Sequence, residues 1–168
     1  KEMFTEIYQE YRSLIFKYIF YRVGDRHLAD DLTSDVFVRM VDKYDHQARE
    51  GRPLAPWLYT IARNLIIDHQ RRAGLVGWQP LHENLPTAGV KAPEKQLEKG
   101  MTHECLAKAM QELTEDQQKV VLLKFIERRS NQEVGKLLGK PEGAIKSLQH
   151  RALAALRRVL EKESCYEA

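Results

Sequence analysis

The side chains best suited to chemistry in this chain lie close together near its C-terminal end. Six polar or charged residues fall within ten positions: Glu142, Lys146, Ser147, Gln149, His150 and Arg151. Such groups donate and accept hydrogen bonds at base edges, and the cationic ones pair with phosphates. The pattern therefore indicates contact with duplex DNA. Residues near the start of a reading helix generally reach bases, and later basic residues generally contact the backbone.

Two helices joined by a tight turn are expected to position these residues. Ser130 and Glu133 have the spacing of a capping box at the start of the first helix. Gly139 can adopt the left-handed conformation that ends it, and Pro141 has a fixed φ suited to the start of the next. Apolar residues recur at helical spacing on the inner side: Val134, Leu137, Leu138, Ile145, Leu148 and Ala152. The pattern predicts a helix-turn-helix, although a helical hairpin with an ordinary solvated surface stays open.

Composition and spacing predict an all-α chain with two helical domains. Residues 74–102 hold three of the six prolines and four of the nine glycines, which is typical of a linker. Helical patterns fill residues 1–73 and 103–168, and no strand pattern persists. The net charge of +3 permits nucleic-acid binding without requiring it. No apolar run approaches the roughly 18 residues of a membrane span.

The first domain combines an acidic helix with a basic, aromatic one. The expected second helix has Leu32, Val36, Met40 and Val41 inward, and its polar face carries Asp30, Asp31, Asp35 and Arg39. A third helix is expected to open at Pro56, with Tyr59, Arg63, Asn64, Arg71 and Arg72 on its outer side. This division of charge suggests one protein partner and one nucleic-acid partner. The alternative is a pair of ordinary solvated helix faces.

Two separate segments resemble a known family. Residues 30–39, residues 57–68 and Arg71-Arg72 resemble region 2 of bacterial sigma factors of the extracytoplasmic-function group. Residues 113–125, with the helix-turn-helix that follows, resemble region 4 of the same group. The resemblance covers nearly the whole chain apart from the linker. Two independent motifs in the right order are more specific than either alone.

The resemblance implies a promoter-specificity subunit of RNA polymerase. Residues 1–73 would be region 2, which binds the polymerase β′ clamp through Asp30, Asp31, Leu32, Asp35, Val36 and Arg39. Region 2 would also recognise and open the −10 element through Tyr59, Arg63, Asn64, Arg71 and Arg72. Residues 103–168 would be region 4, which grips the −35 element and the β flap. The resemblance also implies an anti-sigma factor that holds the protein inactive. A cytoplasmic location is expected from the cysteines, because Cys105 and Cys165 lie far apart and form no disulfide framework in the sequence.

The chemistry of strand opening fits the third helix. A base that leaves the stack costs a few kcal/mol, and each base stacked on an aromatic ring returns roughly 1–3 kcal/mol. Tyr59 and the loop 44–55 could supply such a surface, while Asn64 can bond a base edge. Arg63, Arg71 and Arg72 could hold phosphates. Two alternatives stay open: Trp57 and Tyr59 could be core residues, and Arg71-Arg72 a solvated helix end.

Other classes of function find less support in the residues. His82-Glu83 lacks the second histidine of a helical zinc protease, since position 86 is proline, and no phosphate-binding glycine loop occurs. We therefore expect no catalytic residues, no metal and no cofactor. The remaining rival is a stand-alone helix-turn-helix regulator, which would leave the acidic face unexplained. Leu54, Val41 and Gln149-His150 depart from common family residues. The sequence also leaves open whether the free domains are docked.

Overall fold

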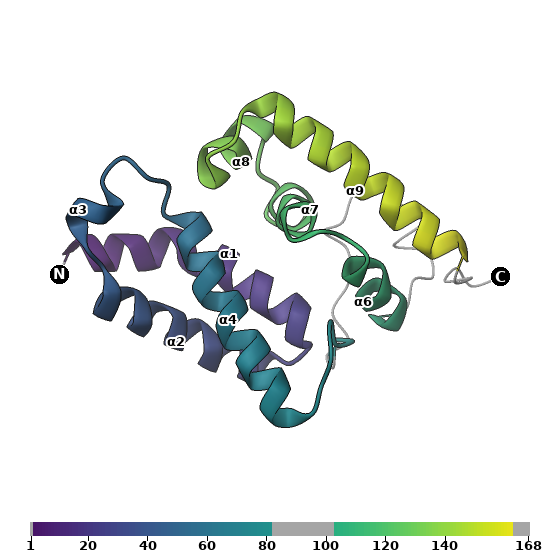
Figure 1. Ribbon diagram of the computed structural model, residues 1–168, viewed down its shortest axis with the longest axis horizontal. Coiled ribbons are helices and arrows are strands. Elements are labelled where there is room, and N and C mark those ends of the chain that lie inside the picture. Colours follow the sequence, from purple (N-terminus) through teal and green to yellow (C-terminus); the bar gives the residue numbers. More distant parts are fainter. Residues whose placement is uncertain (1, 82–102, 163–168) are drawn as a thin grey trace.

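The computed structural model describes residues 2–81 and 103–162, and within them every regular element is a helix. Figure 1 shows the helices in two groups, with α1 to α4 in one and α6 to α9 in the other. The prediction of an all-α chain with two helical domains is confirmed. We call these groups lobe 1, residues 2–73, and lobe 2, residues 103–162.

Lobe 1 is built on three long helices. The helices α1 (Glu2–Val23), α2 (Arg26–Lys43) and α4 (Ala55–Ala73) pack together, and the short α3 (His46–Arg49) lies between α2 and α4 in sequence. Asp25 caps α2, because its Oδ1 accepts hydrogen bonds from the backbone N–H groups of His27 and Leu28 at 2.9 and 3.2 Å. The core contains apolar residues from all three long helices, including Ile15, Ile19, Val36, Leu58 and Ala62.

Lobe 2 contains the expected helix-turn-helix. It comprises α6 (His103–Gln111), α7 (Glu115–Val121), the π-helix η1 (Leu122–Ile126), α8 (Asn131–Leu138) and α9 (Glu142–Lys162). Ser130 and Glu133 form the predicted capping box at α8, and Thr114 and Gln117 form another at α7. Gly139 ends α8 at φ 68°, as predicted.

The chain widens into a π-helix before the helix-turn-helix. The N–H of Glu127 donates to the carbonyl of Leu122 at 2.9 Å, and Arg128 then takes the left-handed conformation at φ 57°. Arg129 closes the turn through its N–H to the Leu123 carbonyl at 2.9 Å. Such π-turns are often found at functional sites. Here the turn brings Glu127 to the side of α1.

The first part of the predicted linker is packed. Trp78 and Leu81 are buried, and the N–H of Gln79 donates to the Arg22 carbonyl at 3.0 Å. The side chain of Gln70 also donates to the Gly77 carbonyl at 2.7 Å. Residues 74–81 therefore belong to the folded body. The rest of the predicted linker, 82–102, and the segment 163–168 lie outside the described residues.

Candidate polymerase and promoter interfaces

The predicted −35 residues lie on the outer side of α9, above a buried support. Lys146, Ser147, His150 and Arg151 line one shallow hollow, Glu142 is exposed at the start of the helix, and Gln149 is half-buried. Beneath them, Val134, Ile145 and Ala152 are fully buried. A solvated polar face on a rigid apolar base is the arrangement that a DNA-reading helix requires.

A glycine that the sequence reasoning missed helps to set the angle between α8 and α9. Gly135 lies inside α8, where glycine is unfavourable. A Cβ at this position would lie 2.7 Å from the Lys140 carbonyl oxygen, in the turn between the helices. The turn can therefore approach α8 only because this side chain is absent. The available signal was a glycine within an otherwise regular helical pattern.

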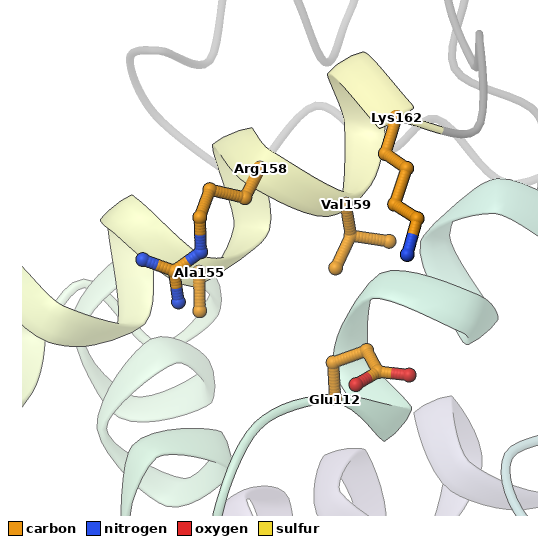
Figure 2. A pocket seen from close by; sticks show the side chains of 5 residues that line it. All are labelled: Glu112, Ala155, Arg158, Val159 and Lys162. Atoms are coloured by element: carbon orange, nitrogen blue, oxygen red, sulfur yellow. The ribbon is translucent and has the colours of Figure 1, made fainter.

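The C-terminal half of α9 carries charge of both signs around a hollow. Arg157 and Arg158 are exposed. Figure 2 shows Arg158 and Lys162 on α9 beside a hollow, with Glu112 on its far side. The hollow has a volume of about 340 Å³. Glu112 offsets part of the positive charge, so this surface is less cationic than the α9 sequence suggests.

The predicted polymerase-binding residues divide into a surface and its support. Asp31, Asp35 and Arg39 are exposed along α2. Asp30 is half-buried, and its Oδ1 lies 3.1 Å from the Arg12 guanidinium of α1. Leu32 and Val36 point inward, with 7% and 0% of their surface exposed. Those two residues hold α2 on the core, and the three exposed charged residues face the solvent.

An apolar groove lies between α1 and α2, on another side of α2. It has a volume of about 490 Å³ and is lined by Phe4, Tyr8, Phe37, Val38 and Val41, among others. The inward placement expected for Val41 is wrong, because 44% of its surface is exposed. Met40, which was also expected inward, is 1% exposed, and one residue further along a helix turns the side chain by about 100°. Sequence reasoning missed this groove.

The predicted −10 residues lie on α4, but they are not equally accessible. Arg63, Asn64, Arg71 and Arg72 are exposed. The guanidinium of Arg71 hydrogen-bonds the Asp68 carboxylate, and this contact, followed by the charge of Arg72, lowers the pKa of Asp68. Asp68 therefore stays ionised and neutralises part of the local positive charge.

Tyr59 lies in the interior and not on the surface. Only 1% of it is exposed, its ring packs edge-on against Tyr18 at 5.0 Å between centroids, and burial raises its pKa. The ammonium of Lys119, from lobe 2, lies 5.3 Å from the ring centroid. Of the two alternatives for Tyr59, the structure shows the buried one. Trp57 is half-buried, and the Arg49 guanidinium lies over its ring, 4.8 Å from the ring centroid.

Arg63 is already occupied by a residue of the other lobe. Its Nε donates to Oε1 of Glu115, at the start of α7, over 3.0 Å. The two lobes thus meet at one of the predicted DNA-binding residues.

Among the described residues, no cluster of three or more His, Cys, Asp or Glu side chains could hold a metal ion. No helix in the described ranges is long and apolar enough to cross a membrane.

Comparison with known proteins identifies both lobes. Residues 7–75 match the family Sigma-70 region 2, and residues 103–156 match the family Sigma-70, region 4. The chain is 31% identical to the extracytoplasmic-function (ECF) RNA polymerase sigma factor SigX of Bacillus subtilis, over 96% of this chain and 85% of that protein. The chain belongs to the ECF sigma factors of the sigma-70 family.

Other similar proteins agree with this assignment. The ECF sigma factor BldN of Streptomyces coelicolor is 35% identical over 97% of this sigma factor, which spans 62% of the length of BldN. A co-crystal structure of the sigma factor RpoE with the anti-sigma factor NepR from Bartonella quintana shares the fold. Its TM-score is 0.54 at 19% identity, over 96% of this chain and 98% of that one.

Membership of this family decides between the functional classes considered from the sequence: a sigma factor, an enzyme and a stand-alone regulator. Sigma factors bind polymerase and give transcription initiation its specificity, and they are not enzymes. The alternative of a stand-alone helix-turn-helix regulator is not supported, because lobe 1 matches region 2 and lobe 2 matches region 4. The acidic α2 and the basic α4 thereby belong to one functional unit with the helix-turn-helix.

Proposed function

We propose that this sigma factor directs core RNA polymerase to promoters with −10 and −35 elements, using the surfaces described above. The observation that carries the proposal is the exposed face of α9. Lys146, Ser147, His150 and Arg151 share one surface there, on a buried apolar support and in the same chain as the region 2 surfaces. Lys146 and Ser147, near the start of α9, would reach base edges of the −35 element. Arg151 would contact its backbone.

Region 2 would join the polymerase through α2. Asp31, Asp35 and Arg39 present charges of both signs, which fix the register of a partner helix more than they add affinity. The neighbouring apolar groove, with 59% of Val38 exposed, adds surface whose burial would strengthen the contact. The charged face and the groove together would meet the β′ clamp, and region 4 would meet the β flap.

The outer side of α4 would receive the −10 element. Arg63, Arg71 and Arg72 can neutralise phosphates, and Asn64 can donate to and accept from one base edge. Tyr59 could stack on an unpaired base only after its ring is uncovered, because Lys119 lies over it. Strand opening through Tyr59 therefore requires the lobes to move apart.

An anti-sigma factor would complete the set of partners. The RpoE structure from Bartonella quintana is a complex with an anti-sigma factor, and we propose that this chain has such a partner too. This sigma factor would act in the cytoplasm, because its polymerase and promoter partners are found there.

Transcription from a promoter library tests the proposal. Core RNA polymerase is assayed with the chain, without it, and with the double variant Asp31→Asn/Asp35→Asn. We expect defined start sites only with the wild-type chain, and weaker transcription with the variant. Glu6→Gln/Glu10→Gln, which removes two charges from the exposed surface of α1, is the matched control. If nothing starts, yet the chain alone protects duplex DNA, the protein acts as a stand-alone regulator and the proposal fails.

A further inference from the structure

The helix α9 contains a glycine in its first turn, on the exposed surface. Gly143 is the second residue of α9, and it is exposed. Within a helix, glycine is the least favourable residue after proline, because its backbone loses the most conformational freedom. Two features of a fold can nevertheless require a glycine: a positive φ, or the close approach of another group to the position of the missing Cβ.

The other two glycines of the helix-turn-helix each show one of these features. Gly139 has a φ of 68°, in the left-handed region that ends α8. Gly135 lies where a Cβ would be only 2.7 Å from the Lys140 carbonyl oxygen. The fold of lobe 2 therefore accounts for both of these glycines.

Gly143 shows neither feature. Its φ is outside the positive range in which the other five left-handed glycines lie. A Cβ at this position would meet no heavy atom of the protein within 4 Å. Among the glycines that the structure describes, this is the only one with neither a positive φ nor a close neighbour. The reason for the glycine therefore lies outside the folded chain.

The position of Gly143 around the helix indicates what that reason is. An α-helix turns by about 100° per residue, so Gly143 lies about 200° around α9 from Ile145. Ile145 is fully buried on the side of α9 that packs on α6, α7 and α8. Gly143 thus faces directly away from the protein. Ser147 lies one turn further along the same side, and Lys146 lies beside it.

A helix that reads the major groove has little room on its outermost side. The groove is about 12 Å wide and about 8.5 Å deep, while a helix with its side chains is about 10–12 Å across. A methyl group between the helix and the DNA would hold the helix back by about 1.5 Å, the length of one C–C bond. Hydrogen bonds of about 2.9 Å to base edges would be lost over such a displacement.

We propose that Gly143 is a positioning residue for recognition of the −35 element. The backbone of α9 would lie closest to the DNA at Gly143, and the missing side chain would let the helix enter the groove far enough for Lys146 and Ser147 to reach base edges. The proposal rests on the proposed function of α9. It explains why an unfavourable helix residue occupies a position where the fold has room for any side chain.

Binding of the polymerase holoenzyme to two promoter DNAs tests the proposal. One DNA carries the −35 sequence shared by the active promoters of the library, and the other carries the same bases in scrambled order. Gly143→Ala should lower the affinity for the first DNA at least about fivefold, as expected for the loss of one base contact, and Gly143→Leu should lower it further. Neither variant should change the affinity for the scrambled DNA.

Ala154→Leu is the matched control for Gly143→Leu. Ala154 is exposed on the same side of α9, about three turns further along the helix. The control places the same leucine side chain on that side at a distance from the first turn. It should leave the affinity for both DNAs unchanged.

Thermal unfolding of the free chain separates a role in positioning from a role in folding. Alanine is the most favourable helix residue, and its methyl group has open space at this position. Gly143→Ala should therefore unfold at the same temperature as the wild type or at a higher one, while its holoenzyme loses −35 preference. A lower unfolding temperature would mean that the fold itself needs the glycine, and the proposal would be wrong.

The binding results also distinguish this proposal from the proposed function. If wild-type holoenzyme binds both DNAs equally well, the −35 function of α9 fails and the role of Gly143 fails with it. If the wild type prefers the −35 sequence and the Gly143 variants prefer it to the same extent, only the role of Gly143 fails. Variants that weaken binding to both DNAs equally would place Gly143 against polymerase, which also contradicts the proposal.

Discussion

Replacing Trp78 by alanine should destabilise the whole protein, although the sequence places this residue in a linker. Its side chain is 6% exposed and packs between the lobes, with the Arg22 guanidinium 5.8 Å from its ring centroid. A tryptophan side chain buries about 200 Å², which at about 25 cal/mol per Å² stabilises the fold by about 5 kcal/mol.

The indole N–H reduces this gain. Trp78 Nε1 is buried without a hydrogen-bond partner among the described residues, and such a group costs about 1–3 kcal/mol. The Trp78→Ala variant should therefore lose about 2–4 kcal/mol of the free energy of unfolding.

Urea denaturation followed by far-ultraviolet circular dichroism measures this loss. With a slope of about 2 kcal/mol per M, the midpoint should fall by about 1–2 M. Val76→Ala is the matched control, because this residue of the same segment is 85% exposed and should change the free energy of unfolding by less than about 0.5 kcal/mol. If both variants shift the midpoint equally little, residues 74–81 are a tether and the packing argument is refuted.

Three further outcomes are expected. Ser130→Ala removes the capping box of α8 and should lower the free energy of unfolding by about 1 kcal/mol. The control Gln132→Ala changes an exposed residue of the same helix and should have almost no effect. Equal effects of the two variants in urea denaturation would contradict this prediction. In holoenzyme binding assays, Lys146→Ala should reduce the preference for the correct −35 base by about 1–3 kcal/mol. Arg151→Ala should instead weaken binding to all DNA sequences alike and reduce the slope of log affinity against log salt concentration by about 0.9. Identical effects of the two variants would contradict the assignment of Lys146 to bases and Arg151 to the backbone. Burial acts to raise the pKa of Glu115, but hydrogen bonds from Arg22, Tyr18 and Arg63 leave it lowered from its usual value of 4.5. The contribution of Glu115 to holding the two lobes together is therefore complete above pH 4.5 and is lost as the pH falls through the lowered pKa. Acid should therefore expand the wild type more than Glu115→Gln in X-ray scattering, and equal expansion would exclude this carboxylate as a cause.

The features that follow from local chemistry could be predicted from the sequence. The capping residue Ser130, the left-handed Gly139 and the buried face around Ile145 all lie where the pattern places them. Each depends on residues a few positions apart, because helix caps and helical faces are set within one or two turns. The family resemblance likewise depends on residues that are contiguous in sequence.

Predictions that depend on contacts between residues distant in sequence were less complete. Val41 was expected inside and is half-exposed, while Leu32 and Val36 support α2 without forming its surface. The burial of Tyr59 could not be chosen over exposure from the sequence. These outcomes depend on which neighbouring helix covers a side chain. A helical pattern gives the direction of a side chain around its own helix axis, but it does not identify the helix that packs against that side.

The sequence by itself determined the helices, the helix-turn-helix and the membership of the sigma factor family. The tertiary structure decided that Trp78 is core and that Glu115 binds Arg22 and Arg63. Glu115 lies 93 residues from Arg22 and 52 from Arg63 in the chain, so no local pattern connects them. Ion pairs over such distances form only when packing brings both helices to the same place. The packing therefore decides which charges are free to meet DNA and which are already paired.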